Sequence, residues 1–287
     1  MHSGTQASGC RPGIYLQDKE SMFKICVCIK QVPATTEVKF DPETNTLIRE
    51  GVESQINPFD LYALEEAVRV REHLAEEGEE TRVTAVCMGP PQAEEALREA
   101  ISLGADDAIL LSDRAFRGAD TWATSYALGL ALLKLEPEIV FCGMQAIDGD
   151  TGQVGPGIAV HMDYAQAPYV AKIESLDKKK IVVKRLLENG YEICSVRLPA
   201  VLTVVKEINE PRTPSLRGKM NAKKAEIPTW TAADIEAPED KIGLPGSPTQ
   251  VVKVFSPPHR EGGEKCTGEP SELADRLARI LAELRIV

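Results

Sequence analysis

The sequence of 287 residues contains no uninterrupted apolar run of about 18 residues, the length that a helix needs to cross a bilayer. A transmembrane segment is therefore not expected. Basic residues are also scarce, because 33 Lys and Arg stand against 44 Asp and Glu and leave a formal net charge of −11. This balance argues against a nucleic-acid-binding surface over most of the protein. With no signal peptide either, the chain is expected in the cytoplasm.

Cysteine pairs with the spacing of a metal site are missing. The seven cysteines include no Cys-x-x-Cys motif, and their number is odd. A disulfide framework is therefore not expected, and neither is an iron–sulfur or zinc site held by this chain alone. Four of the cysteines lie inside apolar runs, where a thiol behaves as a small hydrophobic group; these are Cys26, Cys28, Cys87 and Cys142.

Regular structure is not expected before residue 22. Residues 1–21 are polar and rich in Gly and Ser, without the apolar core of a signal peptide or the Arg-rich helix of a transit peptide. Met22 directly precedes the first apolar run. We interpret residues 1–21 as a disordered extension, and the fold as beginning at residue 22.

Apolar runs and helical patterns alternate through the first half of the chain, and no internal repeats are present. This alternation predicts an α/β fold with an open, mostly parallel sheet. Strands are expected at 23–29, 82–88, 108–111 and 138–142. Helices are expected at 60–77, 92–102, 121–135 and 152–163.

The pattern changes after residue 168, where four further stretches alternate or run apolar. They are 169–175, 180–187, 191–197 and 200–205. Asn189-Gly190 lies between two of them, and Asn-Gly is a strong signal for a tight hairpin. Antiparallel strands are therefore expected to extend the parallel sheet or to form a small second one.

The remaining chain divides into two parts beyond an α/β domain of residues 22–205. Residues 206–230 are rich in Pro and Lys and contain a short predicted helix at 216–223. Residues 231–287 form a C-terminal arm that ends in an amphipathic helix at 270–284. Such a helix docks either on a partner or on the core of its own chain.

The segments after the strands form the candidate site, because open parallel sheets bind ligands beyond the carboxyl ends of their strands. The most informative one is 143–156, whose glycines allow a nucleotide to approach the backbone. Asp150 or Thr151 can cap the helix that follows, and the free N–H groups of its first turn can hold a phosphate. Asp148 and Asp150 also suit a metal or the hydroxyls of a ribose or ribityl chain. A plain capped turn is the alternative interpretation.

Known catalytic and nucleotide-binding patterns are missing. The segment matches neither G-x-G-x-x-G nor G-x-x-x-x-G-K-[ST], which disfavours a classical NAD site or an NTPase. No Ser-His-Asp, Cys-His or paired-acid pattern is present, and none of the four histidines follows a predicted strand. His73 and His161 lie on predicted helices, as packed or solvated side chains. The chemistry is therefore expected to come from a bound cofactor.

Several longer motifs follow one another in a recognisable order. They are Val27-Cys-Ile-Lys-Gln-Val-Pro33, Ile56-Asn-Pro-Phe-Asp60, Met88-Gly-Pro-Pro91, Gln145-Ala-Ile-Asp-Gly-Asp-Thr151, and Val205-Lys-Glu-Ile-Asn-Glu-Pro-Arg212 continuing through Leu216 and Met220 to Lys224. From Met22 to the C-terminus the sequence resembles the β subunits of electron transfer flavoproteins. The resemblance implies a fold of the adenine-nucleotide α-hydrolase-like type and an obligate heterodimer with an α subunit, which the C-terminal arm contacts.

The resemblance also implies a bound nucleotide. In such heterodimers the α subunit holds one FAD, and the β subunit holds either a structural AMP or, in the electron-bifurcating branch, a second FAD. That second FAD takes a hydride from NADH. Its electrons go to ferredoxin or flavodoxin and, through the α-subunit FAD, to an acyl-CoA or other dehydrogenase or a quinone reductase. A stand-alone adenine-nucleotide-binding protein of the same fold is a weaker alternative.

Two segments resemble the FAD-binding branch in particular. One is Asp148–Thr151, and the other is the loop that bifurcating members place around the isoalloxazine, here represented by Asp113, Arg114, Ala115, Phe116, Gly118, Asp120 and Thr121. By this resemblance Phe116 borders the ring and Arg114 stabilises the anionic flavin, whereas an ordinary surface loop is the alternative. Met144 departs from the family, which carries Arg or Lys there. The missing charge would alter nucleotide binding or redox potential unless a partner supplies it.

Further contacts follow from the same resemblance. Those to the nucleotide are Cys28, Lys30, Asn57, Asp60, Met88, Gly143, Gln145, Ala146, Ile147, Asp148, Gly149, Asp150, Thr151, Gln153 and Val154. Residues 211–224 resemble the recognition loop, in which Leu216 inserts into the acceptor dehydrogenase. Arg212, Arg217 and Lys219 would then be steering charges around this anchor. An ordinary surface helix is the alternative.

Overall fold

The computed structural model describes residues 22–34, 39–40, 47–48, 54–252, 262–263 and 265–286. The expectation for residues 1–21 lies outside the described residues. The chain divides into two compact units, Met1–Val251 and Val252–Val287. Residues 231–251 are grouped with the first unit, and residues 252–287 form the second.

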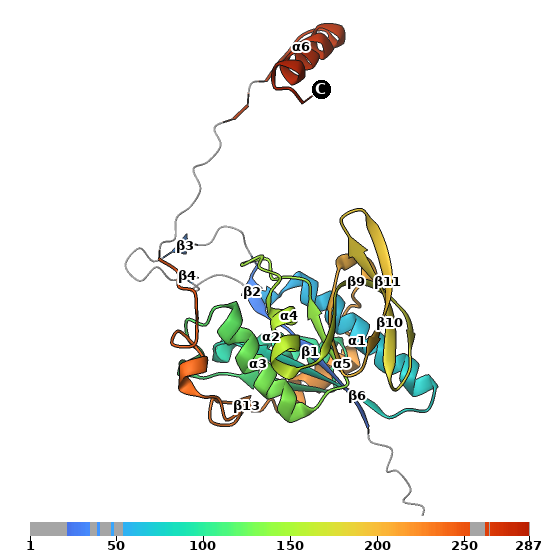
Figure 1. Ribbon diagram of the computed structural model, residues 1–287, viewed down its shortest axis with the longest axis vertical. Coiled ribbons are helices and arrows are strands. Elements are labelled where there is room, and N and C mark those ends of the chain that lie inside the picture. Colours follow the sequence, from blue (N-terminus) through green and yellow to red (C-terminus); the bar gives the residue numbers. More distant parts are fainter. Residues whose placement is uncertain are drawn as a thin grey trace, which may run out of the picture. The chain divides into compact units, whose positions relative to one another are not determined.

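A nine-stranded sheet forms the centre of the first unit (Figure 1). Its strands, in spatial order, are β11 (Gly190–Arg197), β10 (Lys180–Leu187), β9 (Ala165–Leu176), β12 (Ala200–Val204), β8 (Ile139–Gly143), β1 (Phe23–Cys28), β6 (Thr81–Met88), β7 (Asp107–Leu111) and β13 (Thr229–Trp230). Neighbours from β9 to β13 are parallel, and β9, β10 and β11 pair antiparallel. The structure confirms the predicted α/β fold with added antiparallel strands.

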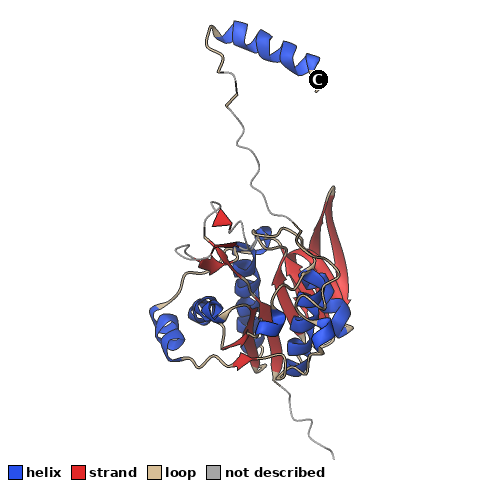
Figure 2. Cartoon of the chain, turned by 90° about the vertical axis from the view of Figure 1, so that its left-hand side faces the viewer, coloured by secondary structure: helices blue, strands red, loops and turns tan. Residues whose placement is uncertain are grey.

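Helices cover both faces of this sheet (Figure 2). They are α1 (Pro58–Glu76), α2 (Glu94–Leu103), α3 (Thr121–Leu135), α4 (Val154–Met162) and α5 (Leu216–Lys224). Short 3₁₀ turns are η1 (Pro91–Ala93), η2 (Arg114–Phe116), η3 (Lys206–Ile208) and η4 (Glu239–Lys241).

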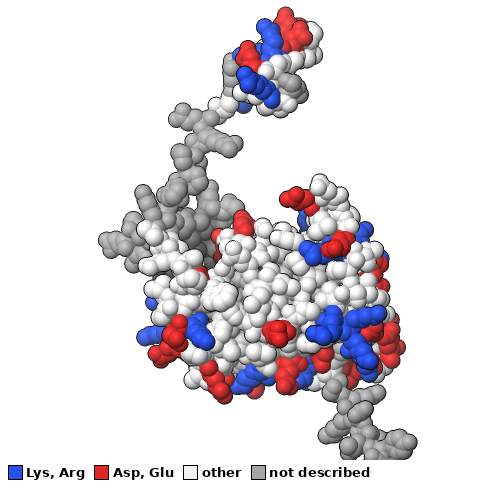
Figure 3. Space-filling model, viewed as in Figure 1, with Lys and Arg blue, Asp and Glu red and all other residues white. Residues whose placement is uncertain are grey.

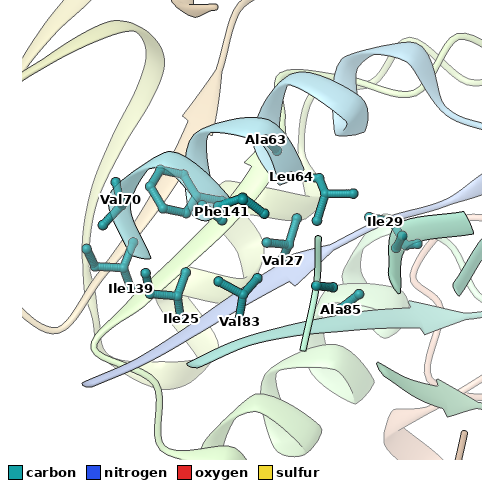
Figure 4. Close-up of a cluster of buried hydrophobic side chains, with 14 of the residues drawn as sticks. Ile25, Val27, Ile29, Ala63, Leu64, Val70, Val83, Ala85, Ile139 and Phe141 are labelled. Atoms are coloured by element: carbon teal, nitrogen blue, oxygen red, sulfur yellow. The ribbon is translucent and has the colours of Figure 1, made fainter. Parts of the chain in front are cut away.

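Two hydrophobic clusters hold the layers together, because successive residues of β1 point to opposite faces of the sheet. Ile25 and Val27 pack toward α1 with Leu64 (Figure 4). Cys26 and Cys28 belong to the cluster on the other face, with residues of α3 and α4. The buried thiols therefore serve as core side chains, as their apolar surroundings predicted.

The elements that sequence periodicity did not indicate are short. They are β2 (Gln31–Pro33), β3 (Lys39–Phe40), β4 (Leu47–Ile48), β5 (Ser54–Ile56) and β13. The fourth predicted helix begins at Val154 instead of residue 152, since Asp150 and Gly152 have positive φ angles of 49° and 62°. Left-handed backbone at these positions prevents the helix from starting earlier.

The second unit contains α6 (Pro270–Glu283), which confirms the predicted C-terminal helix. Leu277 on this helix is 57% exposed, and Leu284 directly after it is 64% exposed. None of the described helices combines the length and apolar character required to span a membrane.

Candidate functional site

The strand order reverses between β1 and β8. From β1 the chain adds β6 and β7 on one side, and then returns to place β8 on the other side of β1. Open α/β sheets bind ligands at the carboxyl ends of strands where such a reversal occurs. Lys30 follows β1 at this place, and Gly143 is the last residue of β8. The predicted site residues after these strands therefore gather at one edge of the sheet.

Asp60 connects the ends of the two strands. Its buried carboxylate accepts hydrogen bonds from the backbone N–H of Lys30 (2.8 Å) and from that of Gly143 (3.2 Å). Proline at position 58 has a preset φ that suits the first turn of α1, which carries Asp60. Burial raises the pKa of the Asp60 carboxyl to about 7, although the hydrogen bonds that it accepts lower it.

Asn57 fastens the loop after β8 to the end of β1. Its backbone N–H donates to the carbonyl of Lys30 (2.8 Å). Its side-chain amide donates to the carbonyl of Gln145 (2.9 Å) and accepts from the N–H of Ile147 (3.1 Å). The side chain does not cap α1, so its hydrogen-bonding groups serve the neighbouring loop instead.

The loop itself contains a tight turn with a charged rim. The N–H of Asp150 donates to the carbonyl of Ala146 (2.8 Å), and the Asp150 carboxylate accepts from the side-chain amide of Gln145 (2.9 Å). Lys30 Nζ lies 2.7 Å from Asp148 Oδ1. At Gly149 an added Cβ would meet nothing within 4 Å, so the turn is open there.

The N-terminus of α4 has no side-chain cap. The prediction that Asp150 or Thr151 caps this helix is wrong, because the N-cap residue is Gln153 and its side chain makes no capping hydrogen bond. Thr121 instead donates its hydroxyl hydrogen to Gln153 Oε1 (2.8 Å). The first N–H groups of α4 therefore lack a side-chain partner, which is the arrangement that favours a bound phosphate.

This Thr121–Gln153 hydrogen bond brings the loop after β7 next to the loop after β8. Within the β7 loop, Asp113 accepts from the N–H groups of Ala115 and Ala232, each at 3.0 Å. These bonds hold the pKa of Asp113 below its usual value. At Asp120 burial alone would raise the pKa of the carboxyl. The hydrogen bonds that it accepts from Thr249 and from the first turn of α3 outweigh burial and lower that pKa.

The other residues of the β7 loop differ in exposure. Phe116 is buried in the cluster on the α3 side of the sheet, whereas Arg114 is exposed. Gly118 has a φ of 75° and lies against Leu244. Contact of these residues with a flavin stays a prediction; in this structure Asp113, Asp120 and Phe116 are engaged by their own chain.

Two further predicted contacts lie at the floor of the site. Cys28 is buried next to Cys142, its register partner on β8, and the Cys28 thiol raises the pKa of Cys142, as does burial. Met88, at the end of β6, packs against the same cluster. Their side chains are held in the core, so any contact with a ligand involves mainly their backbone.

Tyr169 is a neighbour of the site that sequence reasoning missed. It has a φ of 60° within β9, where a register shift interrupts the pairing with β12, and its N–H donates to Thr203 Oγ1 (3.0 Å). Its hydroxyl oxygen lies 3.8 Å from the position of a Cβ on Gly152. The irregularity depends on a neighbouring strand far along the sequence, so periodicity carries no signal for it.

The predicted partner-binding residues lie elsewhere, on α5 and just before it. Leu216 is 79% exposed and Met220 is 52% exposed, one turn apart. Arg217 and Lys219 are exposed beside them. Arg212 differs, since its guanidinium is bound within the chain by Glu65 and Glu72.

The chain is similar to known proteins over most of its length. The model of the electron transfer flavoprotein domain matches residues 44–235. The electron transfer flavoprotein subunit beta of Thermoanaerobacterium thermosaccharolyticum is 51% identical, over 92% of this chain and 100% of the relative. Subunit CarD of the caffeyl-CoA reductase-Etf complex of Acetobacterium woodii is 48% identical over the same shares. Protein FixA of Azotobacter vinelandii is 45% identical, over 90% of this chain and 94% of the relative.

The family model covers most of the chain, and these relatives align over nearly their whole length. Both findings lead to the same family. The predicted resemblance is thereby confirmed at the level of the family, and a flavin or nucleotide cofactor follows at the same coarse level. The chain belongs to the electron transfer flavoprotein family, as a β subunit that functions in electron transfer.

Proposed function

We propose that this protein pairs with an α subunit and binds FAD of its own at the edge of the sheet where β1, β7 and β8 end. The observation that carries the proposal is the open turn at Gly149 beside the uncapped N-terminus of α4. Together they offer room and free N–H groups for a pyrophosphate, which is larger than the single phosphate of AMP.

When bound, the FAD would accept a hydride from NADH and pass single electrons to ferredoxin or flavodoxin and, through the α-subunit FAD, to a dehydrogenase or quinone reductase. The chain's own residues bind and orient it. The N–H groups of Val154 and its neighbours hold the phosphates, and Asp150 accepts from ribityl or ribose hydroxyls. Lys30, beside Asp148, would supply positive charge near the phosphates, and the exposed Arg114 would supply it near the reduced ring.

One feature of the surface supports the pairing with an α subunit. Figure 3 shows a broad area of the first unit without charged side chains, in the region where Figure 1 draws α3 and α4. Trp122 on α3 is 52% exposed and Val160 on α4 is 62% exposed. Exposed apolar side chains in an uncharged area are characteristic of a protein interface.

Met144 favours the second candidate function, in which AMP fills the site and only the α-subunit flavin carries electrons. Met144 lies directly after β8 and is uncharged, whereas the family carries Arg or Lys at this position. A reduced, anionic flavin requires nearby positive charge more than AMP does.

Acid extraction and chromatography of the purified, co-expressed heterodimer decide between the two functions. We expect about two FAD per heterodimer and no AMP, since each subunit would hold one flavin. About one FAD with one AMP would contradict the proposal and identify a carrier with a single flavin. In the first case, ferredoxin reduction driven by NADH is the next assay.

The role of Asp150 is tested by Asp150→Asn. Asparagine tolerates the left-handed backbone at this position, so the change removes the charge without straining the turn. We expect a several-fold lower occupancy of the β-subunit nucleotide. The control is Asp163→Asn, because Asp163 has the same backbone conformation (φ 54°) at the far end of α4. Equal occupancy in both variants would refute the assignment of Asp150 to the nucleotide.

A further inference from the structure

Helix α1 carries a second set of functional contacts beyond Asn57 and Asp60. Two turns further along, Glu65 and Glu66 are buried, at 4% and 9% exposure. Buried carboxylates are rare unless they are paired, since burial removes their hydration. Both carboxylates have partners in residues 209–212, the segment between β12 and α5, and Glu65 also binds Arg69 of its own helix.

Arg212 makes the strongest of these contacts. Its Nε lies 2.7 Å from Glu65 Oε2 and its Nη1 lies 2.7 Å from Glu72 Oε1. Nη2 bridges the two carboxylates at 3.2 Å and 3.0 Å, and the backbone N–H of Arg212 also donates to Glu65 (3.2 Å). Burial alone would raise the pKa of Glu65, but the hydrogen bonds from Arg212 and Arg69 outweigh it and lower that pKa. The planar guanidinium is thus held in one orientation.

Neighbouring residues complete this attachment. Asn209 donates its side-chain amide hydrogens to the carbonyl of Tyr62 (3.0 Å) and to Glu66 Oε2 (2.9 Å). Arg69 donates to Glu65 Oε1 (2.6 Å) and to the carbonyl of Glu210 (3.2 Å). The segment before α5 is therefore fixed to α1 through both backbone and side chains.

The far side of α5 is fixed to α2. An added Cβ on Gly218 would lie 2.2 Å from the carbonyl oxygen of Ser102, so glycine is required for this close approach. Arg98 Nη1 donates to the carbonyl of Ala222 (2.7 Å), in the last turn of α5. Between these two attachments Leu216 and Met220 project from a helix whose position is determined on both sides.

We propose that Glu65 is a positioning residue for partner recognition, which acts by clamping Arg212 and so fixing α5 in the orientation that presents Leu216 and Met220 together. The inference rests on the proposed role of α5 in docking to an acceptor dehydrogenase, and it reassigns Arg212 from steering charge to internal anchor. A partner then meets an apolar pair already in place. If the clamp is lost, α5 samples other orientations, and the apparent affinity falls with the fraction of molecules that remain competent.

The variants Glu65→Gln and Arg212→Lys separate positioning from direct contact. Glu65→Gln keeps the size of the side chain but replaces one acceptor oxygen with a donor that faces the guanidinium. Because Glu65 is buried, it can influence a partner only through the side chains that it binds, Arg212 and Arg69. Arg212→Lys keeps the charge and loses the fork of donors. The control is Arg82→Lys, at an exposed ion pair with Asp107 on the sheet.

The test uses the nucleotide-loaded heterodimer and a purified acyl-CoA dehydrogenase reduced with its acyl-CoA. For Glu65→Gln and Arg212→Lys we expect the KM for the heterodimer to rise by about tenfold or more with kcat nearly unchanged, as lower competent populations require. Amide hydrogen exchange should become faster in residues 209–224, while nucleotide content and the Arg82→Lys variant stay at wild-type values.

Three outcomes have distinct meanings. Faster exchange with an unchanged KM would overturn the inference and leave the clamp as a purely stabilising contact. A higher KM for Arg212→Lys with wild-type exchange and a normal Glu65→Gln variant would also overturn it, because Arg212 would then touch the partner itself. A wild-type heterodimer that exchanges no electrons with the dehydrogenase would instead refute the proposed docking partner, independently of the exchange measurement.

Discussion

Gly143→Ala is expected to lower the free energy of unfolding by about 2–3 kcal/mol, the upper range for overpacking a well-filled site. The added Cβ would lie 2.4 Å from Asp60 Oδ1 and 2.7 Å from the carbonyl carbon of Phe59. The second of these atoms is backbone in the first turn of α1, so it cannot move away alone. Relief of the clash requires α1 and β8 to separate at the site.

The same separation should reduce nucleotide content. Asp60 accepts from the N–H of Gly143, and Asn57, one turn earlier, holds the loop after β8. A displaced first turn of α1 therefore disturbs both contacts at once. Urea denaturation at fixed protein concentration measures the stability of the heterodimer, and acid extraction measures the nucleotide.

Gly149→Ala provides the matched control in the same loop. Its Cβ would meet nothing within 4 Å, and its φ is not positive, so the change in stability should stay within about 0.5 kcal/mol. Equal stability of the two variants would mean that the ends of α1 and β8 are farther apart than described. A nucleotide lost from Gly149→Ala alone would show that the open turn is needed for binding and not for folding.

The main layers of the fold were predictable because their signals are local. The apolar run of β1 and the helical spacing of α1 each lie within a single stretch of sequence, and both elements formed where they were expected. The short strands β2 and β5 were not predictable, since three residues form a strand only when a partner is near. The start of α4 was predicted too early because Asp150 adopts a left-handed conformation. Asparagine and aspartate tolerate this conformation, but their presence in a sequence does not show that they adopt it.

The candidate site was predictable in position but not in its internal contacts. The rule that ligands bind after parallel strands indicated the loops after β1, β7 and β8. It did not indicate that Asp113 binds the N–H of Ala232 or that Arg212 binds Glu65, because these partners are 119 and 147 residues apart. A charged residue in a motif can serve a ligand, a partner or its own chain, and only the three-dimensional neighbours distinguish these roles.

Helix α1 contacts both the candidate nucleotide site and the segment before α5. Asn57 and Asp60 at its start hold the ends of β1 and β8, and Glu65 further along holds the segment before α5. The helix packs on the sheet through Leu64 and Val68.

The contribution of Asp60 to the stability of the protein is expected to fall as the pH rises from about 4 to about 7. The folded state raises the pKa of this carboxyl to about 7 through burial, while an unfolded chain leaves it near 3.8. Between these values the folded state binds the extra proton, so each increase in pH favours the unfolded state. Above about 7 the carboxyl is ionised in both states, and its contribution becomes constant. The total change is on the order of a few kcal/mol, at about 1.4 kcal/mol for each pKa unit.

Asp60→Asn isolates this contribution, because asparagine does not titrate. Its amide can accept from only one of the two N–H groups of Lys30 and Gly143, so the variant should be less stable than the wild type at every pH. Its stability should nevertheless change less between pH 5 and pH 8, and the difference from the wild type should be largest at pH 5. Urea denaturation across this range gives the slopes. The infrared C=O band of protonated carboxyls should lose more intensity near pH 7 in the wild type than in the variant, because only the wild type carries the Asp60 carboxyl. Parallel slopes for both proteins would mean that Asp60 is ionised throughout, with Lys30 as the nearby cation that keeps it so.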